Sequence, residues 1–125
     1  MRIFWWGEAC DFLPEPATGT RVTRFTATPM TNTNIYCEQP YTTPDGARVA
    51  VLRAQNSDPR MPPSALCVID LRRYRLGVVE PLVRSVLVAT AGYSGILYYL
   101  DGELHLVRFD MNSLERAVLF PWTLS

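Results

Sequence analysis

Residues 70–79 read DLRRYRLGVV and residues 110–119 read DMNSLERAVL, so one pattern recurs after 40 residues. Each copy follows an apolar run and, before that run, an expected strand: residues 65–69 and 48–52 in the first unit, residues 104–107 and 96–100 in the second. A four-stranded unit that repeats about every 40 residues is typical of a β-propeller blade. The repeat therefore predicts two blades, whereas complete propellers have about 4–8.

The composition fits a folded domain and excludes several classes of partner. The chain has 125 residues, of which 48% are hydrophobic, and its acidic and basic residues balance at twelve each. Binding of nucleic acid or of an anionic membrane needs a basic excess, which this chain lacks. All twelve basic residues are arginines. Either the base composition of the genome explains this bias, or arginine forks serve to bind carboxylates bidentately.

The cysteines and the N-terminus predict a cytoplasmic protein. Cys10, Cys37 and Cys67 are odd in number and form no CxxC pair, which favours a reducing compartment over a disulfide framework or a metal site. The apolar start at residues 1–6 is too short for a signal peptide and acids soon follow it. No run reaches the ~20 apolar residues of a membrane span.

The order of strands and turns along the chain follows from period-two patterns and turn residues. Alternating β-branched residues predict a half-buried strand at Thr20–Thr26, followed by a polar connection at residues 27–34 and a short strand at Ile35–Tyr41. A turn is expected at Thr43-Pro44-Asp45-Gly46, since proline presets φ and glycine accepts positive φ. Ala47–Ala54 is the next expected strand.

Two loops at equivalent places differ in length. Residues 55–64 form a proline-rich loop, whereas its counterpart in the second unit is the hairpin turn Asp101-Gly102. The longer loop is either a functional insertion or a neutral one. Apolar residues point to both sides of residues 65–71, so the sheet is expected to be covered on both faces. A stack of two blades would then leave two apolar faces open.

The sequence thus predicts an all-β protein, a partial β-propeller of two four-stranded antiparallel blades plus an N-terminal strand. We divide it into residues 1–34 as N-terminal lead and closing strand, 35–82 as first blade and 83–125 as second blade. The open faces imply that the chain is the first portion of a longer ancestor or that copies assemble into a closed ring.

Several of these segments resemble the opening of the oligogalacturonate lyases. The likeness runs through Val22-Thr23-Arg24-Phe25-Thr26, Ile35-Tyr36 and Tyr41-Thr42-Thr43-Pro44-Asp45-Gly46. In the second unit it continues through Leu97-Tyr98-Tyr99-Leu100, Val107-Arg108-Phe109-Asp110 and Leu114-Glu115-Arg116. It covers roughly residues 18–120. The Thr-Pro-Asp-Gly turn also occurs in WD40-like propellers of the Tol-Pal system and in those of prolyl oligopeptidases.

The resemblance implies a seven-bladed propeller that cleaves short galacturonides by β-elimination in pectin breakdown, a carbon–oxygen lyase with manganese bound by histidines and a glutamine. Those ligands belong to later blades of the family. This chain has the single histidine His105, and Thr31-Asn32-Thr33-Asn34 stands where the family tends to have Cys-His. No catalytic or metal-binding residue can therefore be carried over, and no cofactor is expected in this chain.

Candidate ligand-binding residues lie in the connections that border the channel of a propeller. Asn32, Asn34, Tyr36 and Gln39 are candidates for hydrogen bonds to sugar hydroxyls, or else they cap turns. Arg53 and Arg60 flank the long loop as candidates for a carboxylate clamp, or else they are ordinary solvated charges. Tryptophan rings at Trp5, Trp6 and Trp122 would stack on sugars or cover blade faces and edges.

Three functions are considered on the sequence alone, and the lack of a signal-peptide pattern argues against one of them, a periplasmic propeller of the Tol-Pal type. The first is an opening portion or truncated member of a lyase-like propeller that binds an oligogalacturonide or another acidic sugar and is inactive alone. The second is a binding or self-assembling module that forms homo-oligomers through its open blade faces.

Overall fold

The computed structural model describes residues 3–27, 31–33, 41–54, 64–87 and 94–121, and these residues contain strands and turns but no helix. The predicted all-β class is therefore confirmed. The strands are β1 Trp5–Trp6, β2 Cys10–Asp11, β3 Thr23–Arg24, β4 Thr31–Thr33, β5 Arg48–Ala54, β6 Ser64–Asp70, β7 Arg75–Leu87, β8 Ile96–Asp101, β9 His105–Asp110 and β10 Glu115–Pro121.

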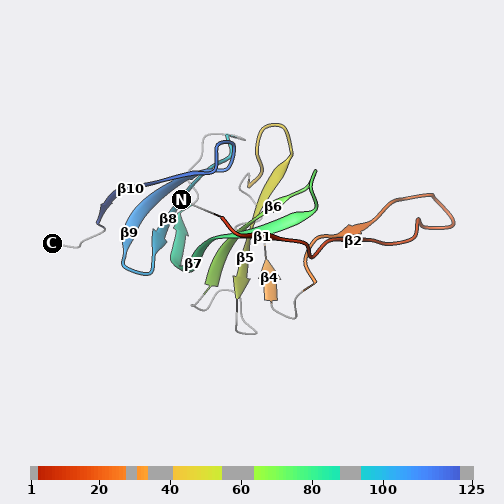
Figure 1. Ribbon diagram of the computed structural model, residues 1–125, viewed down its shortest axis with the longest axis horizontal. Coiled ribbons are helices and arrows are strands. Elements are labelled where there is room, and N and C mark those ends of the chain that lie inside the picture. Colours follow the sequence, from red (N-terminus) through yellow and green to blue (C-terminus); the bar gives the residue numbers. More distant parts are fainter. Residues whose placement is uncertain (1–2, 28–30, 34–40, 55–63, 88–93, 122–125) are drawn as a thin grey trace.

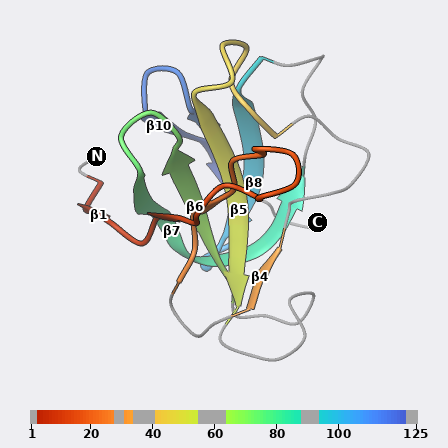
Figure 2. The ribbon, with the colours of Figure 1, turned by 90° about the vertical axis from the view of Figure 1, so that its right-hand side faces the viewer.

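Strands β4 to β10 form an antiparallel meander in chain order, with β7 in the middle (Figure 1). The first half of β7 pairs with β6 and its second half pairs with β8. The register slips around Pro81, which has no N–H to donate to a ladder. Figure 2 shows β7 curving from one set of strands to the other. We call β4, β5, β6 and the start of β7 the first blade, and the end of β7 with β8, β9 and β10 the second blade.

Strand β7 belongs to both blades and runs across the predicted limit between residues 82 and 83. The predicted domains 1–34, 35–82 and 83–125 therefore stay predictions. The repeat itself has a clear structural counterpart. Asp70 accepts hydrogen bonds from the backbone N–H groups of Arg72 and Arg73, and Asp110 accepts one from that of Asn112. The turn of each hairpin then ends on a residue of positive φ, which is 55° at Tyr74 and 63° at Leu114. The 40-residue repeat is thus a repeated hairpin with the same turn chemistry.

The two blades share one hydrophobic core. Buried side chains from both blades form it, which makes the blades a single packed unit. Its buried members are Ala50, Leu66, Val68, Val79 and Val83 from β5, β6 and β7, and Leu97, Tyr99, Val107, Phe109 and Met111 from the second half of the chain. Arg48 of β5 also donates from Nη1 to the backbone oxygens of Met111 and Asn112 at 2.6 and 2.9 Å.

The N-terminal segment, residues 3–27, covers the other face of the first blade. Trp6 and Phe25 pack there on the buried Cys67, Ile69 and Leu76. The expectation of two open apolar faces is therefore wrong for the first blade. Sequence patterns did not reveal this because the contacts join residues far apart in the chain.

Strand β1 attaches this segment to the outer edge of β7, where Trp5 and Trp6 pair with Gly77 and Leu76. A Cβ atom at Gly77 would lie 2.5 Å from a methyl group of Ile3 and 3.1 Å from the Trp5 ring. Gly77 thus lets the N-terminal segment approach the strand closely. Covering the edge of β7 also protects a row of backbone groups that would otherwise be unpaired.

The predicted strand at Thr20–Thr26 is mostly wrong. Only Thr23–Arg24 forms a strand, and it pairs with β2 in a separate two-stranded ribbon that extends away from the sheet (Figure 1). Part of the expected polar connection at 27–34 is instead strand β4, which pairs with the end of β5. The reason is that Thr31 and Thr33, both β-branched, suit a strand as well as a connection. The expected strand at Ile35–Tyr41 lies outside the described residues except for Tyr41.

Two predicted turns have different outcomes. The turn at residues 43–46 is confirmed, with Gly46 at a φ of 69°. The two-residue hairpin at Asp101-Gly102 is wrong, because residues 102–104 separate β8 from β9 and the positive φ of 61° falls on Leu104. Asp101 explains the longer loop, since its Oδ1 accepts the backbone N–H groups of Glu103 and His105. Of the long loop at 55–64, only Ser64 is described, and it begins β6.

Replacing Leu104 by glycine is expected to raise the free energy of unfolding by about 0.5–1 kcal/mol. A non-glycine residue at positive φ costs about 1–2 kcal/mol, and glycine loses part of that gain through chain entropy. Little packing is lost, since Leu104 is 46% exposed. Urea unfolding measures the change. In the control, Val118→Gly at a paired position of strand β10 and 49% exposure, stability should fall; a rise in both or a fall in both would contradict the assignment of strain to Leu104.

Candidate functional site

Two of the six predicted ligand-binding residues come together in the structure. Asn32 of β4 and Arg53 of β5 are cross-strand partners, and Nε of Arg53 donates to Oδ1 of Asn32 at 2.9 Å. The other four, Asn34, Tyr36, Gln39 and Arg60, lie outside the described residues. A role of all six in ligand binding stays a prediction.

Arg53 binds a carboxylate, but this carboxylate belongs to the chain itself. Its Nη2 lies 2.9 Å from Oε2 of Glu8, and both side chains are about 95% buried, at 5% and 4% exposure. Glu8 also accepts hydrogen bonds from Nε1 of Trp6 and from the backbone N–H of Ala27. The predicted carboxylate clamp therefore anchors the N-terminal segment on the first blade. Spacing along the sequence offered no signal for this pair.

Cys67 lies beside this ion pair and is not a reactive thiol. Burial raises its pKa to about 11, and the opposing attraction of Arg53 for the thiolate is smaller. A thiol with such a pKa stays protonated and unreactive at neutral pH. Cys10 is a second free cysteine, and it is exposed on the ribbon.

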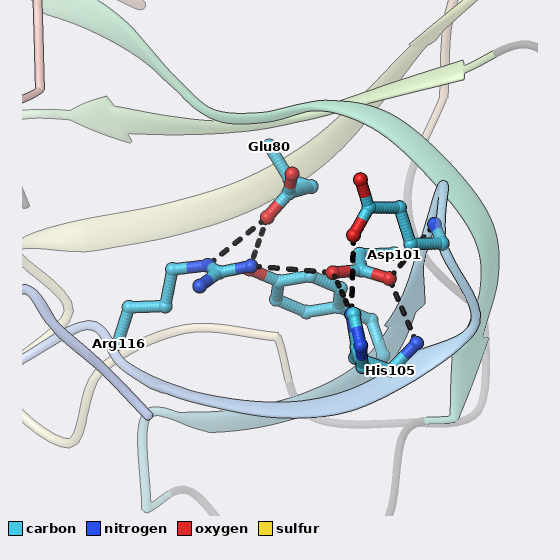
Figure 3. A network of polar contacts seen from close by, with 6 residues as sticks. Glu80, Asp101, His105 and Arg116 are labelled. Atoms are coloured by element: carbon cyan, nitrogen blue, oxygen red, sulfur yellow. Dashed lines mark hydrogen bonds and ion pairs between the residues drawn. The ribbon is translucent and has the colours of Figure 1, made fainter. Parts of the chain in front are cut away.

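A second polar network joins Glu80, in the part of β7 that pairs with β6, to the second blade (Figure 3), and it was not predicted. Nε of Arg116 lies 3.1 Å from Oε2 of Glu80, and its Nη2 lies 3.4 Å from Oδ2 of Asp101. The hydroxyl of Tyr99 donates to Oε2 of Glu80 at 2.9 Å. The sequence held one signal for this network: in the repeat, Arg116 stands where the first unit has the buried Leu76.

His105 belongs to the same network. Its Nδ1 lies 3.2 Å from Oδ2 of Asp101 and 3.7 Å from Oε2 of Glu103, and the side chain is about one third exposed. Burial would raise the pKa of Asp101, but hydrogen bonds from His105 and Glu103 together lower it. Burial and the nearby Glu80 raise the pKa of Tyr99, so its hydroxyl remains a neutral donor. The network orients one imidazole toward a carboxylate, and its other charges are paired internally.

Because folding lowers the pKa of Asp101, its ionised form stabilises the fold above the ordinary carboxyl pKa, and this contribution is lost as the pH falls. We expect Asp101→Asn, which keeps an acceptor for both backbone N–H groups, to be less stable than the native chain at pH 7. The difference should begin to shrink as the pH falls below about 4, the ordinary carboxyl pKa, and should be lost as the pH falls through the lowered pKa of the native carboxyl. Thermal unfolding of both proteins from pH 7 down to about pH 2 measures it, and a constant difference over that whole range would contradict the assignment.

No metal centre is found in the part of the chain that the structure describes. No group of three or more histidine, cysteine, aspartate or glutamate side chains there could hold a metal ion. The residues present therefore do not fit the manganese site implied by the resemblance, and we derive no chemistry through a metal. In the same described ranges, no helix is long and apolar enough to cross a membrane.

Fold and blade repeat together define a partial β-propeller of antiparallel blades. Among solved structures it is similar to an oligogalacturonate lyase from Vibrio parahaemolyticus, with 18% sequence identity and a TM-score of 0.62. It is also similar to an oligogalacturonate lyase in complex with manganese, with 20% identity and a TM-score of 0.61. Both matches cover 94% of this chain and 30% of the lyase chain. No protein-family model and no curated protein matches the sequence.

These comparisons confirm the predicted likeness to the oligogalacturonate lyases at the level of the fold. The chain spans about 30% of the length of the lyase structures that it matches. At 18–20% identity the likeness extends to the arrangement of strands and not to the chemistry.

Proposed function

We propose that the chain forms the opening blades of a propeller related to the oligogalacturonate lyases, and that it binds an acidic sugar without carrying out β-elimination by itself. The observation that carries this proposal is the fold likeness over 94% of the chain. β-Elimination needs a base and a metal or cation that stabilises the enolate. His105 is the single histidine, and the described residues offer no metal cluster beside it. Manganese and catalysis then belong to other blades of such a propeller.

Calorimetric titration with digalacturonate tests the binding half of this proposal. We expect the chain to bind digalacturonate and not the neutral disaccharide galactobiose, since arginine recognises the carboxylates. Equal binding of both sugars, or of neither, would overturn it.

An elimination assay tests the other half. Prolonged incubation of the chain with digalacturonate and manganese should give no ultraviolet absorbance from an unsaturated product. Product that accumulates in proportion to the protein concentration would show that the chain is an enzyme in its own right.

Self-association is a second candidate function, and one observation favours it. Leu66 is fully buried between the blades, but its repeat counterpart Leu106 is only half-buried, on the outward face of the second blade near the 49% exposed Phe120. The N-terminal segment already covers the equivalent receiving face of the first blade. A head-to-tail ring needs both faces of each copy, and one of them is already covered. We therefore expect a two-fold dimer, in which the same outward face of two copies packs together. Light scattering that shows a monomer at all concentrations would end this alternative.

A further inference from the structure

A pocket lies at the end of the blades where the repeated hairpins meet, opposite the loop that joins Asp101 to His105. It consists of two adjoining hollows of about 260 and 330 Å³ that share Arg48, Asp70 and Arg73. The remaining lining residues are Thr43, Asp45, Ala47, Arg72 and Asn112 on one side, and Trp5, Arg75 and Leu114 on the other. Four arginines and two aspartates give the lining a net positive charge.

Some of the charged side chains of this pocket have partners within the described part of the protein, and others do not. Arg48 binds two backbone oxygens and lies 3.8 Å from Asp70, and Arg72 lies 3.5 Å from Asp45. The guanidinium groups of Arg73 and Arg75, in contrast, form no hydrogen bond or ion pair with any residue that the structure describes, although the backbone N–H of Arg73 donates to Asp70. Asp70 is buried and is held by the backbone of its own hairpin. The pocket therefore has two guanidinium groups available for an anion.

The repeat provides an internal control for these arginines. The first hairpin carries Arg73 and Arg75, whereas the equivalent positions of the second hairpin are Ser113 and Glu115. Both hairpins keep the aspartate turn and the positive φ. The turn geometry thus does not require arginine, and of the two hairpins that line the pocket only the first carries the positive charge.

Trp5 adds an aromatic wall. Strand β1 holds it in place by pairing with Gly77, and its ring borders the same hollow as Arg73 and Arg75. A sugar ring presents apolar C–H groups that pack on an aromatic face, while a carboxylate accepts paired hydrogen bonds from arginine. The aromatic ring and the two arginines together match a sugar that carries a carboxylate.

We propose that this pocket binds a uronic acid unit of an acidic sugar, with Arg73 and Arg75 holding its carboxylate and Trp5 packing on its ring. The choice of sugar rests on the proposed function; the anion site rests on the pocket alone. It lies apart from Asn32 and Arg53, which the sequence had favoured.

Calorimetry on the full chain tests the proposal with digalacturonate, galactobiose and inorganic phosphate. The Arg73→Gln/Arg75→Gln variant should bind digalacturonate about tenfold or more weakly, because two charge-assisted contacts are lost. Arg84→Gln, an exposed arginine of β7 outside the pocket, should bind as the native chain does. Both variants should keep the native melting temperature, because the substituted side chains are exposed.

The outcomes separate the site from the function. Native binding of digalacturonate that the double variant retains would overturn the pocket and leave the proposed function standing. Phosphate binding that the double variant loses, without any digalacturonate binding, would overturn the acidic-sugar function and the sugar assignment while supporting the anion site. If a folded Trp5→Leu variant binds digalacturonate as tightly as the native chain, the proposed packing of Trp5 on the sugar ring is wrong.

Discussion

Replacing Glu8 by glutamine will lower the free energy of unfolding by about 3–5 kcal/mol, because it leaves the guanidinium of Arg53 buried without its counter-charge. The pair is 2.9 Å apart and almost wholly excluded from solvent. Glutamine keeps the size of the side chain, so the loss measures charge pairing more than packing. Chemical denaturation with two-state analysis gives the value, and circular dichroism before denaturation checks that the variant folds.

An exposed ion pair provides the control for Glu8→Gln. Arg72 and Asp45 lie 3.5 Å apart with 68% and 55% of their side chains exposed. Such pairs contribute about 0–1 kcal/mol, so Arg72→Gln should change stability little. If Glu8→Gln were as mild as Arg72→Gln, the anchoring role of Glu8 would be refuted. Replacing Glu8 and Arg53 together by apolar residues should recover much of the loss, since no unpaired charge then remains.

Truncating Phe109 to alanine is the second large perturbation, with an expected loss of about 3–5 kcal/mol. Phe109 is fully buried in the core that joins the two blades. The truncation removes its apolar area and leaves a cavity that neighbouring strands cannot fill without moving. Because the core is shared, we expect both blades to unfold in one transition at a lower denaturant concentration.

Phe4→Ala is the matched control, since Phe4 is 79% exposed. Its effect should stay within about 0.5 kcal/mol. Fluorescence and circular dichroism should give coincident curves for Phe109→Ala. Separate transitions, with one blade melting before the other, would instead indicate two independent cores.

Local patterns predicted the part of the fold that local chemistry determines. Asp70 and Asp110 fold their hairpins through hydrogen bonds to residues two or three positions away, so a repeat in sequence became a repeat in structure. The turn at Pro44-Asp45-Gly46 was predictable for the same reason. The strands beside these turns follow from their apolar composition and from the register that the turns impose.

Contacts between distant residues escaped prediction. Glu8 and Arg53 pair across 45 positions, and Arg116 and Glu80 across 36. A charged residue that is buried by such a partner reads in the sequence as an ordinary surface charge. The pocket arginines were missed for a different reason. The arginine-rich composition indicated that carboxylates could be bound, but only the folded hairpin places Arg73 and Arg75 in one hollow beside Trp5.

The N-terminal segment over the first blade gives this fold a direction. Ile69 and Phe109 are repeat counterparts; the first packs beneath the N-terminal segment and the second against the preceding blade. Each of the two blades thus has two different faces, one directed toward the N-terminal segment and one directed toward the C-terminal end of the chain. With the backward end already closed by Trp6 and Phe25, further blades can be added only beyond β10. An engineered propeller built from this chain should therefore be extended at its C-terminal end, keeping residues 3–27 as its permanent first layer.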